Sequence, residues 1–537
     1  MAGLELPPDN PPLDGRSVAS YLKGDTKTLP EKSAVFANWH PRWEGDHYDP
    51  LQDKTKQLDI SKQRITIMNE RFKYIQNDYN VPGCPKSPDG MILIDLKNDP
   101  LESSSVASSK PESRLQTAIN HAEAGDRIIV EDGVYTTTDF IMVECQGTAA
   151  DPIIIEAETI LGVEITGTSG FYINKYAKHV TVKGFHFTHS TDLDTSGTSK
   201  IKEAQFCRFT RNFFNCTGSG DLLTTTGADT QIDHNEFSYQ NPDVGEHMIY
   251  VWGTIDRVWI HHNYFHDQNR QHNGTEVIKY GTGTQGSDST HGLIEYNLIE
   301  RCEGDYETIS NKSNGNTYRY NTLIDCRTFT LRGGDDCVVY GNYIRNSEGL
   351  RVYGARHRIF SNYFEGCTRG VSAGNGLDTS YAAADDCVIA YNTFINNNVH
   401  YLRSSHGNVP PTHVTVANNI MQGGGNMGWV SEDDPYTGTW EGNIGWNCGT
   451  GNMPAEGYTI VDPQLATDAN GVYRLQAGSP AINAGAGSYA FVDVDIDGQT
   501  RDVSPDVGAD EVSRKPILNR PLTKADVGPF AKNAPSP

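Results

Sequence analysis

The sequence predicts an all-β protein, a right-handed parallel β-helix with a short N-terminal capping helix. A phrase of two or three apolar residues, Asn and an aromatic or aliphatic residue recurs at intervals of roughly 20 to 35 residues, the period of stacked solenoid units. Short β-branched runs such as VTV (180–182) and CVI (387–389) precede the Asn, which favours strands over helices. The repeated Asn falls at Asn212, Asn235, Asn263, Asn297, Asn321, Asn342, Asn362, Asn392 and Asn418. We expect these residues to form an internal asparagine ladder.

The cysteines support the same register. Three of them follow their Asn by five positions and three precede theirs by five, namely Cys302, Cys326 and Cys367, and Cys207, Cys337 and Cys387. Equal phase in successive coils predicts inward-facing stacks of structural thiols, because no CxxC or His/Cys metal spacing is present. A disulfide between stacked cysteines, such as Cys302 and Cys326, is compatible with this register.

Three regions follow from the extent of the repeat. Residues 1–110 have no repeat, and we expect them to pack on or cap the solenoid. Residues 111–512 form the β-helix, which begins with an amphipathic helix at 115–124 that covers the open end of the first coil. The motifs SPAINAG (479–485) and DVGADE (506–511) suggest a closing segment, and residues 513–537 form a C-terminal tail.

The formal net charge of −24 argues against nucleic acid or an anionic membrane as a partner. A polyanionic glycan would also be repelled at long range, so it must meet a local basic groove. No apolar run reaches the length of a transmembrane span, and residues 1–20 have no signal-peptide core. We expect a monomer that is secreted or periplasmic, with its signal absent from the given chain.

An oxygen-rich cluster lies in the middle of the repeat. It consists of Asn273, Glu276, Asp305 and Glu307. Asp305 and Glu307 are two positions apart, so they point to the same side of a strand, and Asn273 lies on the preceding coil. Matching the Asn phrases (step 34) places Asn273 over Glu307. Matching E-x-I, from Glu276 to Glu307 (step 31), places it over Gly304, next to Asp305. With either alternative, one amide and two carboxylates can share a cation, because neighbouring coils are about 4.8 Å apart.

Basic residues lie beside this cluster, which could otherwise be a solvated acidic patch paired with Lys279 and Lys312. Arg332 (LRGG) and Arg351 (LRVYG) occur in similar contexts on successive coils, which predicts a basic column for uronate carboxylates. Lys312 is the candidate base, since a nearby cation and Arg332 would lower its pKa. The residues expected to bind substrate along the groove are Lys279, Arg351, Tyr353, Arg356 and His357.

This arrangement suits elimination on a uronic-acid polysaccharide. The cation masks the sugar carboxylate, a base removes the adjacent proton, and an acid assists the leaving oxygen. A glycoside hydrolase would instead need paired carboxylates, and two pairs are available, Asp335 with Asp336 and Asp385 with Asp386. Both pairs precede strand starts at the same phase, which favours a turn-capping role.

Four segments resemble polysaccharide lyase family 6, the β-helix family of alginate lyases and chondroitinase B. They are NGTEVIK (273–279), DYETISNKSNGNTYRYNT (305–322), FTLRGG (329–334) and GLRVYGARHRIFSNYFEG (349–366). The resemblance covers roughly residues 111–512. It implies that Asn273, Asp305 and Glu307 bind calcium, and that Lys312 takes the C5 proton. It further implies that Arg332 acts as acid towards the glycosidic oxygen and that Arg351 holds a neighbouring sugar.

The prediction is therefore an enzyme, a polysaccharide lyase that cleaves alginate by calcium-assisted β-elimination. Asp305 stands where the family pattern has glutamate, which shortens the reach of this ligand by one methylene. A dermatan sulfate (chondroitin B) lyase is the alternative within the same chemistry. The alternative from another class is a non-catalytic glycan-binding β-helix, for which Lys312 and Arg332 would have no function.

Overall fold

The computed structural model describes residues 111–532, except 190–198, 219, 242–244, 283–288, 378–380, 404–406 and 431–437, together with four N-terminal strands. The chain divides into two compact units, Met1–Ala118 and Ile119–Pro537. The first contains an antiparallel sheet of β1 (Val35–Trp39), β2 (Arg64–Met68), β3 (Phe72–Gln76) and β4 (Met91–Asp95). The rest of residues 1–110 lies outside the described residues, so its packing on the solenoid stays a prediction.

The predicted N-terminal helix is present but begins earlier than expected. Helix α2 spans Pro111–Asn120 rather than 115–124. Leu115 and Ile119, four positions apart on one face, are both buried. The helix begins at Pro111, a residue suited to a first helical turn because it lacks the N–H that would be unpaired there.

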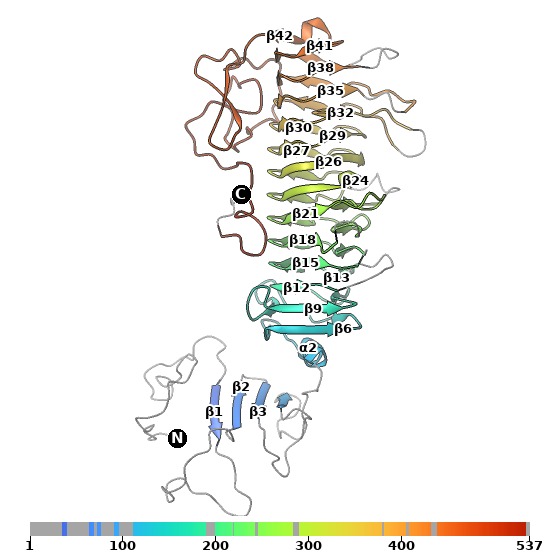
Figure 1. The fold of residues 1–537 in the computed structure, drawn as a ribbon, viewed down its shortest axis with the longest axis vertical. Coiled ribbons are helices and arrows are strands. Elements are labelled where there is room, and N and C mark those ends of the chain that lie inside the picture. Colours follow the sequence, from blue (N-terminus) through green and yellow to red (C-terminus); the bar gives the residue numbers. More distant parts are fainter. Residues whose placement is uncertain are drawn as a thin grey trace, which may run out of the picture. The chain divides into compact units, whose positions relative to one another are not determined.

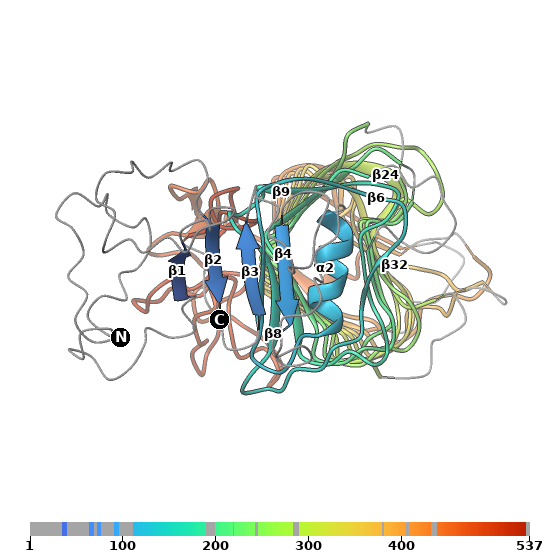
Figure 2. The ribbon, with the colours of Figure 1, turned by 90° about the horizontal axis from the view of Figure 1, so that it is seen from below.

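The second unit is the predicted parallel β-helix, in which each coil contributes strands to three columns (Figures 1 and 2). Column one is the 13-stranded sheet of β5 (Arg127–Val130), β8 (Ile153–Ala157), β11 (Val180–Lys183), β14 (Arg208–Thr210), β17 (Gln231–Asp233), β20 (Trp259–His261), β23 (Leu293–Glu295), β25 (Thr317–Arg319), β27 (Val338–Tyr340), β30 (Arg358–Phe360), β33 (Val388–Ala390), β36 (Thr415–Ala417) and β39 (Trp440–Glu441).

The other two columns join into one 25-stranded sheet. Column two contains β6 (Gly133–Thr137), β9 (Val163–Gly167), β12 (Phe185–Phe187), β15 (Phe213–Cys216), β18 (Glu236–Tyr239), β21 (Tyr264–Gln268), β28 (Tyr343–Arg345), β31 (Tyr363–Glu365), β34 (Thr393–Ile395), β37 (Ile420–Gln422), β40 (Asn443–Trp446) and β42 (Tyr458–Ile460). Column three contains β7 (Ile141–Val143), β10 (Phe171–Ile173), β13 (Ser199–Ile201), β16 (Leu223–Thr225), β19 (Ile249–Val251), β22 (Ile278–Tyr280), β29 (Gly349–Val352), β32 (Val371–Ala373), β35 (Val399–Arg403), β38 (Asn426–Trp429) and β41 (Gly449–Gly451).

Two long strands connect the columns of the larger sheet. β24 (Leu298–Lys312) and β26 (Thr322–Gly333) each run through column two and continue into column three. Their register slips between Cys302 and Glu307 and again after Asn311. Such bulges re-aim side chains and recur beside active sites. Both predicted catalytic residues, Lys312 and Arg332, lie on these two strands.

The predicted asparagine ladder runs through ten successive coils. The amide oxygen of Asn235, for example, accepts the backbone N–H of Asn212 at 2.9 Å and its side-chain amide at 3.0 Å. The members are Asn212, Asn235, Asn263, Asn297, Asn321, Asn342, Asn362, Asn392, Asn419 and Asn443. The prediction of Asn418 was wrong by one position. Asn418 adopts the positive φ of +54° found before ladder residues, and its side chain binds Ala486 instead.

Removal of one ladder residue should destabilise the solenoid. Asn321→Ala removes the acceptor of both Asn297 amides and the donor to the Ile294 carbonyl, all of them buried. Each buried polar group left without a partner costs about 1–3 kcal/mol, so we expect a clearly lower melting temperature. Asn398→Ala, at an exposed position, is the matched control. Equal melting temperatures of the two variants would show that the ladder contributes no net stability.

Aromatic and thiol side chains fill the interior in stacks. The rings of Phe187, Phe214, Phe237 and Phe265 lie over one another with centroids 4.5–4.9 Å apart. The six cysteines predicted to face inward are all buried, and the nine described cysteines are all free thiols. Cys302 pairs in register with Cys326, as predicted, without a disulfide.

The chain after β42 returns along the outside of column two (Figure 1). The short 3-10 helix η2 (Ala455–Gly457) precedes β42, and a hairpin of β43 (Leu465–Thr467) and β44 (Tyr473–Leu475) follows it. Leu522 and Val527 are buried against Tyr264, Tyr296 and Tyr320 of the solenoid. The segment predicted as a tail from residue 513 therefore packs on the solenoid flank as far as the structure describes it.

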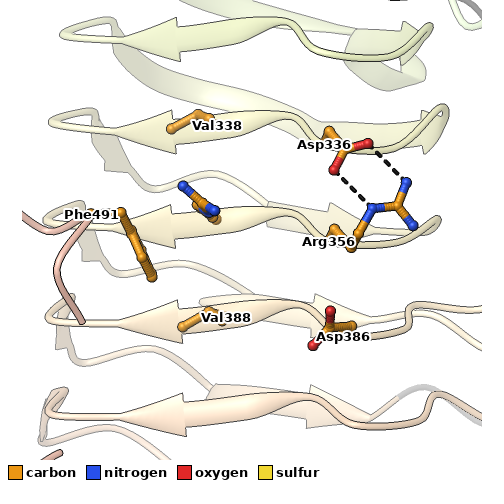
Figure 3. A pocket seen from close by; sticks show the side chains of 7 residues that line it. Asp336, Val338, Arg356, Asp386, Val388 and Phe491 are labelled. Carbon is orange, nitrogen blue, oxygen red and sulfur yellow. Dashed lines mark hydrogen bonds and ion pairs between the residues drawn. The ribbon is translucent and has the colours of Figure 1, made fainter. Parts of the chain in front are cut away.

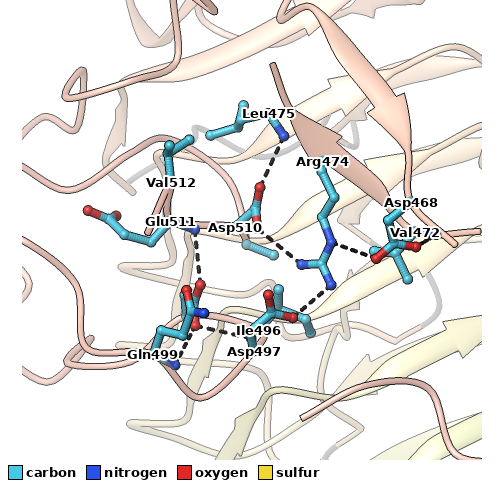
Figure 4. Close-up of polar contacts among 12 residues, drawn as sticks. Asp468, Val472, Arg474, Leu475, Ile496, Asp497, Gln499, Asp510, Glu511 and Val512 are labelled. Carbon is cyan, nitrogen blue, oxygen red and sulfur yellow. Dashed lines mark hydrogen bonds and ion pairs between the residues drawn. The ribbon is translucent and has the colours of Figure 1, made fainter. Parts of the chain in front are cut away.

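An ionic network fastens the closing segment (Figure 4). Arg474 binds Asp468, Asp497 and Asp510 at 2.7–3.1 Å. The carboxylate of Asp495 accepts backbone N–H groups, among them that of Gln499 at 2.7 Å. Asp495, Asp497 and Asp510 bring their oxygens within 4.8 Å of one another, the spacing of a metal site. Because arginine and backbone N–H groups already donate to these carboxylates, we interpret the network as a structural contact that holds the closing segment together, and not as a metal site.

Candidate active site

The register of the third column resolves the alternative that the sequence left open. Ile278 of β22 pairs with Ile309 of β24, which corresponds to the step of 31. The backbone N–H of Gly274 donates to Asp305 Oδ2 at 2.8 Å, which fits the same step. Asn273, the chain neighbour of Gly274, thus lies near Asp305 rather than over Glu307. The asparagine ladder nevertheless has a step of 34 here, from Asn263 to Asn297. The two steps differ because fewer residues separate the ladder from column three in the coil of β24 than in the preceding coil.

Glu307 is a buried carboxylate held between two arginines. Arg351 Nη2 donates to Oε1 at 2.5 Å, and Arg332 Nη1 donates to Oε2 at 3.4 Å. Ser310 Oγ adds a third donor at 2.5 Å. The two arginines are not stacked as their similar sequence contexts suggested, since Arg351 pairs with Thr330 in register. They converge on Glu307 from different rows of the sheet.

Lys312 lies at the end of β24 and is only 8% exposed. Its Nζ is 3.8 Å from Glu276 Oε1. Burial and the charge of Lys279 lower the pKa of Lys312 to about 8, although Glu276 opposes the shift. A lysine with this pKa is partly neutral at neutral pH and mostly neutral above pH 8, and a general base must be neutral.

Three buried residues, Asp221, His247 and Glu276, form a chain of contacts that ends beside Lys312. Glu276, 2% exposed, lies 3.0 Å from His247 Nε2, and His247 Nδ1 lies 2.7 Å from Asp221. Burial favours the neutral forms of Glu276 and His247, but their contacts with oppositely charged groups have the larger effect. They lower the pKa of Glu276 to about 2 and raise that of His247 to about 9. Glu276 is therefore an anion beside Lys312, able to stabilise the ammonium that forms when the base takes a proton.

Sequence reasoning found Glu276 but missed Asp221 and His247. Each of the three lies two positions before the start of a column-three strand, and Glu307 lies two positions before Ile309, which pairs with that column. The same spacing from the strand start could have identified these residues in the sequence. The repeated Asn did not reveal it, because the number of residues between the asparagine ladder and column three differs from coil to coil.

The other predicted residues divide into two groups. Lys279 joins the site, 3.8 Å from Glu276, and the Tyr353 ring lies beside Arg351 but is itself buried. His357 is completely buried, with Nε2 bound to the Tyr353 carbonyl, so the prediction that it lines the groove was wrong. Tyr381, not identified from the sequence, lies under the Arg332 guanidinium at 4.9 Å.

Arg356 lies elsewhere, at a pocket of about 410 Å³ on the first column (Figure 3). Its guanidinium binds Asp335 and Asp336, so the structure does not bring it to the site of Lys312. Asp336 and Asp386 have φ of +58° and +49°. Asp335 accepts the Ala355 N–H at 2.8 Å, as a turn-capping residue does, which argues against a hydrolase carboxylate pair.

The donor set of the predicted cation site is of the type that calcium prefers. Asp305 and Glu307 would supply carboxylates, and Asn273, an exposed residue, would supply an amide oxygen. One oxygen of Asp305 accepts the Gly274 N–H, and both oxygens of Glu307 have donors. The ligands fit a calcium ion chemically, but an ion at Glu307 competes with Arg351. A second group, Asp221, Glu246 and His247, has the spacing of a metal site, but His247 is already paired on both nitrogens.

Solved structures share this fold. The PL6 family alginate lyase AlyGC matches with a TM-score of 0.60 and 22% identity over 69% of this chain, and the match spans about half (55%) of that protein. A mannuronic acid specific polysaccharide family 6 lyase from human gut microbiota matches with a TM-score of 0.57 and 21% identity, covering 71% of this chain and 91% of the other. Pedsa3628 from Pseudopedobacter saltans, a PL6 family polysaccharide lyase, matches with a TM-score of 0.53, 18% identity and coverage of 63% and 91%. No curated protein sequence matches the chain.

The fold is the parallel β-helix of these polysaccharide lyases. The sequence model of the chondroitinase B family matches residues 107–426, more than half of the chain. The chain belongs to the chondroitinase B family, and the resemblance to polysaccharide lyase family 6 is confirmed. No helix in the described part of the chain is long and apolar enough to span a membrane.

Proposed function

We propose that the protein cleaves alginate by β-elimination. The observation that carries the proposal is the position of Lys312, a buried lysine whose pKa is lowered to about 8, beside an anion and within the same cluster as Arg332 and Arg351. Three structural relatives are described as alginate lyases, one in complex with a trisaccharide and one with G6. A lysine whose pKa is lowered inside a cluster of charged groups is typical of catalytic sites.

The chemistry follows from the charges of these groups. Neutral Lys312 removes the proton from C5, a C4–C5 double bond forms, and the C4–O bond breaks. The pKa of Arg332 is raised, because Glu307 and Tyr381 outweigh its burial, so its guanidinium stays charged and donates a hydrogen bond to the leaving oxygen. That oxygen takes its proton from water, and the Lys312 ammonium beside Glu276 returns its proton to solvent. Arg351 binds a neighbouring uronate carboxylate.

The test is ultraviolet absorbance during incubation with polymannuronate, polyguluronate and dermatan sulfate in parallel. Elimination leaves a double bond conjugated to the carboxylate, which absorbs, whereas hydrolysis leaves none. A rise on an alginate polymer supports the proposal. A rise on dermatan sulfate alone would favour the substrate in the family's name. New reducing ends without absorbance would indicate a hydrolase, and no change would favour a glycan-binding solenoid.

Calcium bound by Asn273, Asp305 and Glu307 would supply positive charge to the substrate carboxylate. We expect a chelator to abolish activity and added calcium to restore it. Added calcium should also raise the melting temperature, because an ion that binds only the folded state stabilises it. Asp305→Asn should weaken the shift, and Asp336→Asn, at the distant pocket, is the control. Activity that resists the chelator would mean that the arginines alone neutralise the carboxylate.

A further inference from the structure

An exposed tryptophan, Trp252, lies on the same face of the solenoid as Lys312, next to the buried Tyr250. In β19 the side chains of Ile249 and Val251 point inward and are fully buried, so Tyr250 and Trp252 point outward. Their rings stack with centroids 5.3 Å apart and an interplanar angle of 21°. Trp252 is 44% exposed, so its ring is accessible to a ligand.

The pair is connected to the active site through the strand register. Tyr250 pairs with Lys279, whose ammonium lies 4.8 Å above the Tyr250 ring, and Val251 pairs with Tyr280. Tyr280 in turn pairs with Asn311. The residues that follow Val251, Tyr280 and Asn311 therefore lie side by side on the outer face. They are Trp252, Gly281 and Lys312.

The glycine between the tryptophan and the lysine places no side chain between them. Gly281 has a φ of +87°, and a Cβ there would come within 3.4 Å of Lys312 Cβ and 3.0 Å of its carbonyl oxygen. Trp252 and Lys312 are two strand spacings apart, about 9–10 Å. A ring bound over Gly281 would have Lys312 on one side and the indole on the other, with Lys279 next to it.

We propose that Trp252, supported by Tyr250, is a sugar-stacking subsite for the uronate unit beyond the one that Lys312 deprotonates. The proposal rests on the proposed function. The C–H face of a pyranose is apolar and packs against an indole, while its carboxylate is within reach of Lys279. Stacking adds affinity without adding charge, which suits an acidic protein that must hold an acidic polymer.

The chain offers a matched control in Trp429. It is 45% exposed and lies on the same face, in the row that contains Lys279 and Arg351, but five strands beyond β24. We expect Trp252→Ala to raise KM about tenfold on oligosaccharides long enough to reach the subsite, with kcat unchanged. On the shortest oligosaccharide cleaved it should act as wild type, and Trp429→Ala should do so on all short oligosaccharides. A Trp252→Ala protein with wild-type KM at every length, or equal effects of the two variants, would overturn the proposal.

Binding without turnover separates this inference from the proposed function. In the Lys312→Ala protein, calorimetric titration with oligomannuronate and oligoguluronate measures affinity alone. A further Trp252→Ala change should weaken it about tenfold, and Trp429→Ala should not. Absence of elimination by the wild-type protein would refute the lyase while leaving this titration valid. Equal affinity with and without the indole would refute the subsite.

Discussion

Lys312→Ala should lower kcat by about two to four orders of magnitude, the usual contribution of a general base. The alanine protein should melt near the wild-type temperature, because Lys312 lies at a strand end and its ion pair with Glu276, at 3.8 Å, is loose. Initial rates from ultraviolet absorbance, with melting curves of both proteins, measure the two effects separately.

Lys312→Arg distinguishes a base from a simple positive charge. Arginine keeps the charge facing Glu276 but does not lose its proton in proteins. The arginine variant should therefore be nearly as inactive as the alanine variant. Substantial activity in Lys312→Arg would show that the residue acts by charge and that another group takes the proton.

The pH profile of the wild-type enzyme provides an independent check. The base must be neutral, so kcat/KM should rise with pH and level off above the pKa of Lys312, about 8. The groups that face Lys312 are Lys279 and Arg332, which lower its pKa, and Glu276 and Glu307, which raise it. Glu276→Gln should therefore move the rise in activity to lower pH. A profile that does not rise near pH 8 would argue against Lys312 as the base.

The sequence predicted the repeat far better than the site, for a physical reason. The asparagine ladder and the cysteine stacks repeat because every coil buries the same positions, so one chain displays the pattern many times. The site occurs once. The convergence of Arg332 and Arg351 on Glu307 depends on bulges in β24 and β26, which change the register locally. Spacing alone could not show those bulges, and it placed the arginines in one column.

The errors at His357 and Arg356 have the same origin. Both follow Arg351 closely in sequence, but the chain leaves the third column after β29 and turns towards β30 of the first. His357 becomes a buried turn residue, bound to the Tyr353 carbonyl and accepting the Cys337 N–H. Nearness in sequence predicts nearness to the site only within one strand. The Asp221–His247–Glu276 chain shows the converse, since its members come from three successive coils and are in contact.

Arg332→Ala should also lower kcat by about two to four orders of magnitude, whereas Arg351→Ala should act mainly on KM. Both arginines bind Glu307, but only Arg332 lies on β26, whose Gly333 pairs with Lys312. Its guanidinium, held over the Tyr381 ring, is placed to stabilise the oxygen that leaves after Lys312 takes the proton. Steady-state kinetics of the two variants on one polymer compare these effects. If both raised KM alone, Arg332 would bind the ground state, and the leaving oxygen would depend on another donor.

Arg332→Lys separates the effect of charge from that of geometry, because a lysine keeps the positive charge but lacks the planar fork of the guanidinium. A kcat well above that of Arg332→Ala would show that charge dominates.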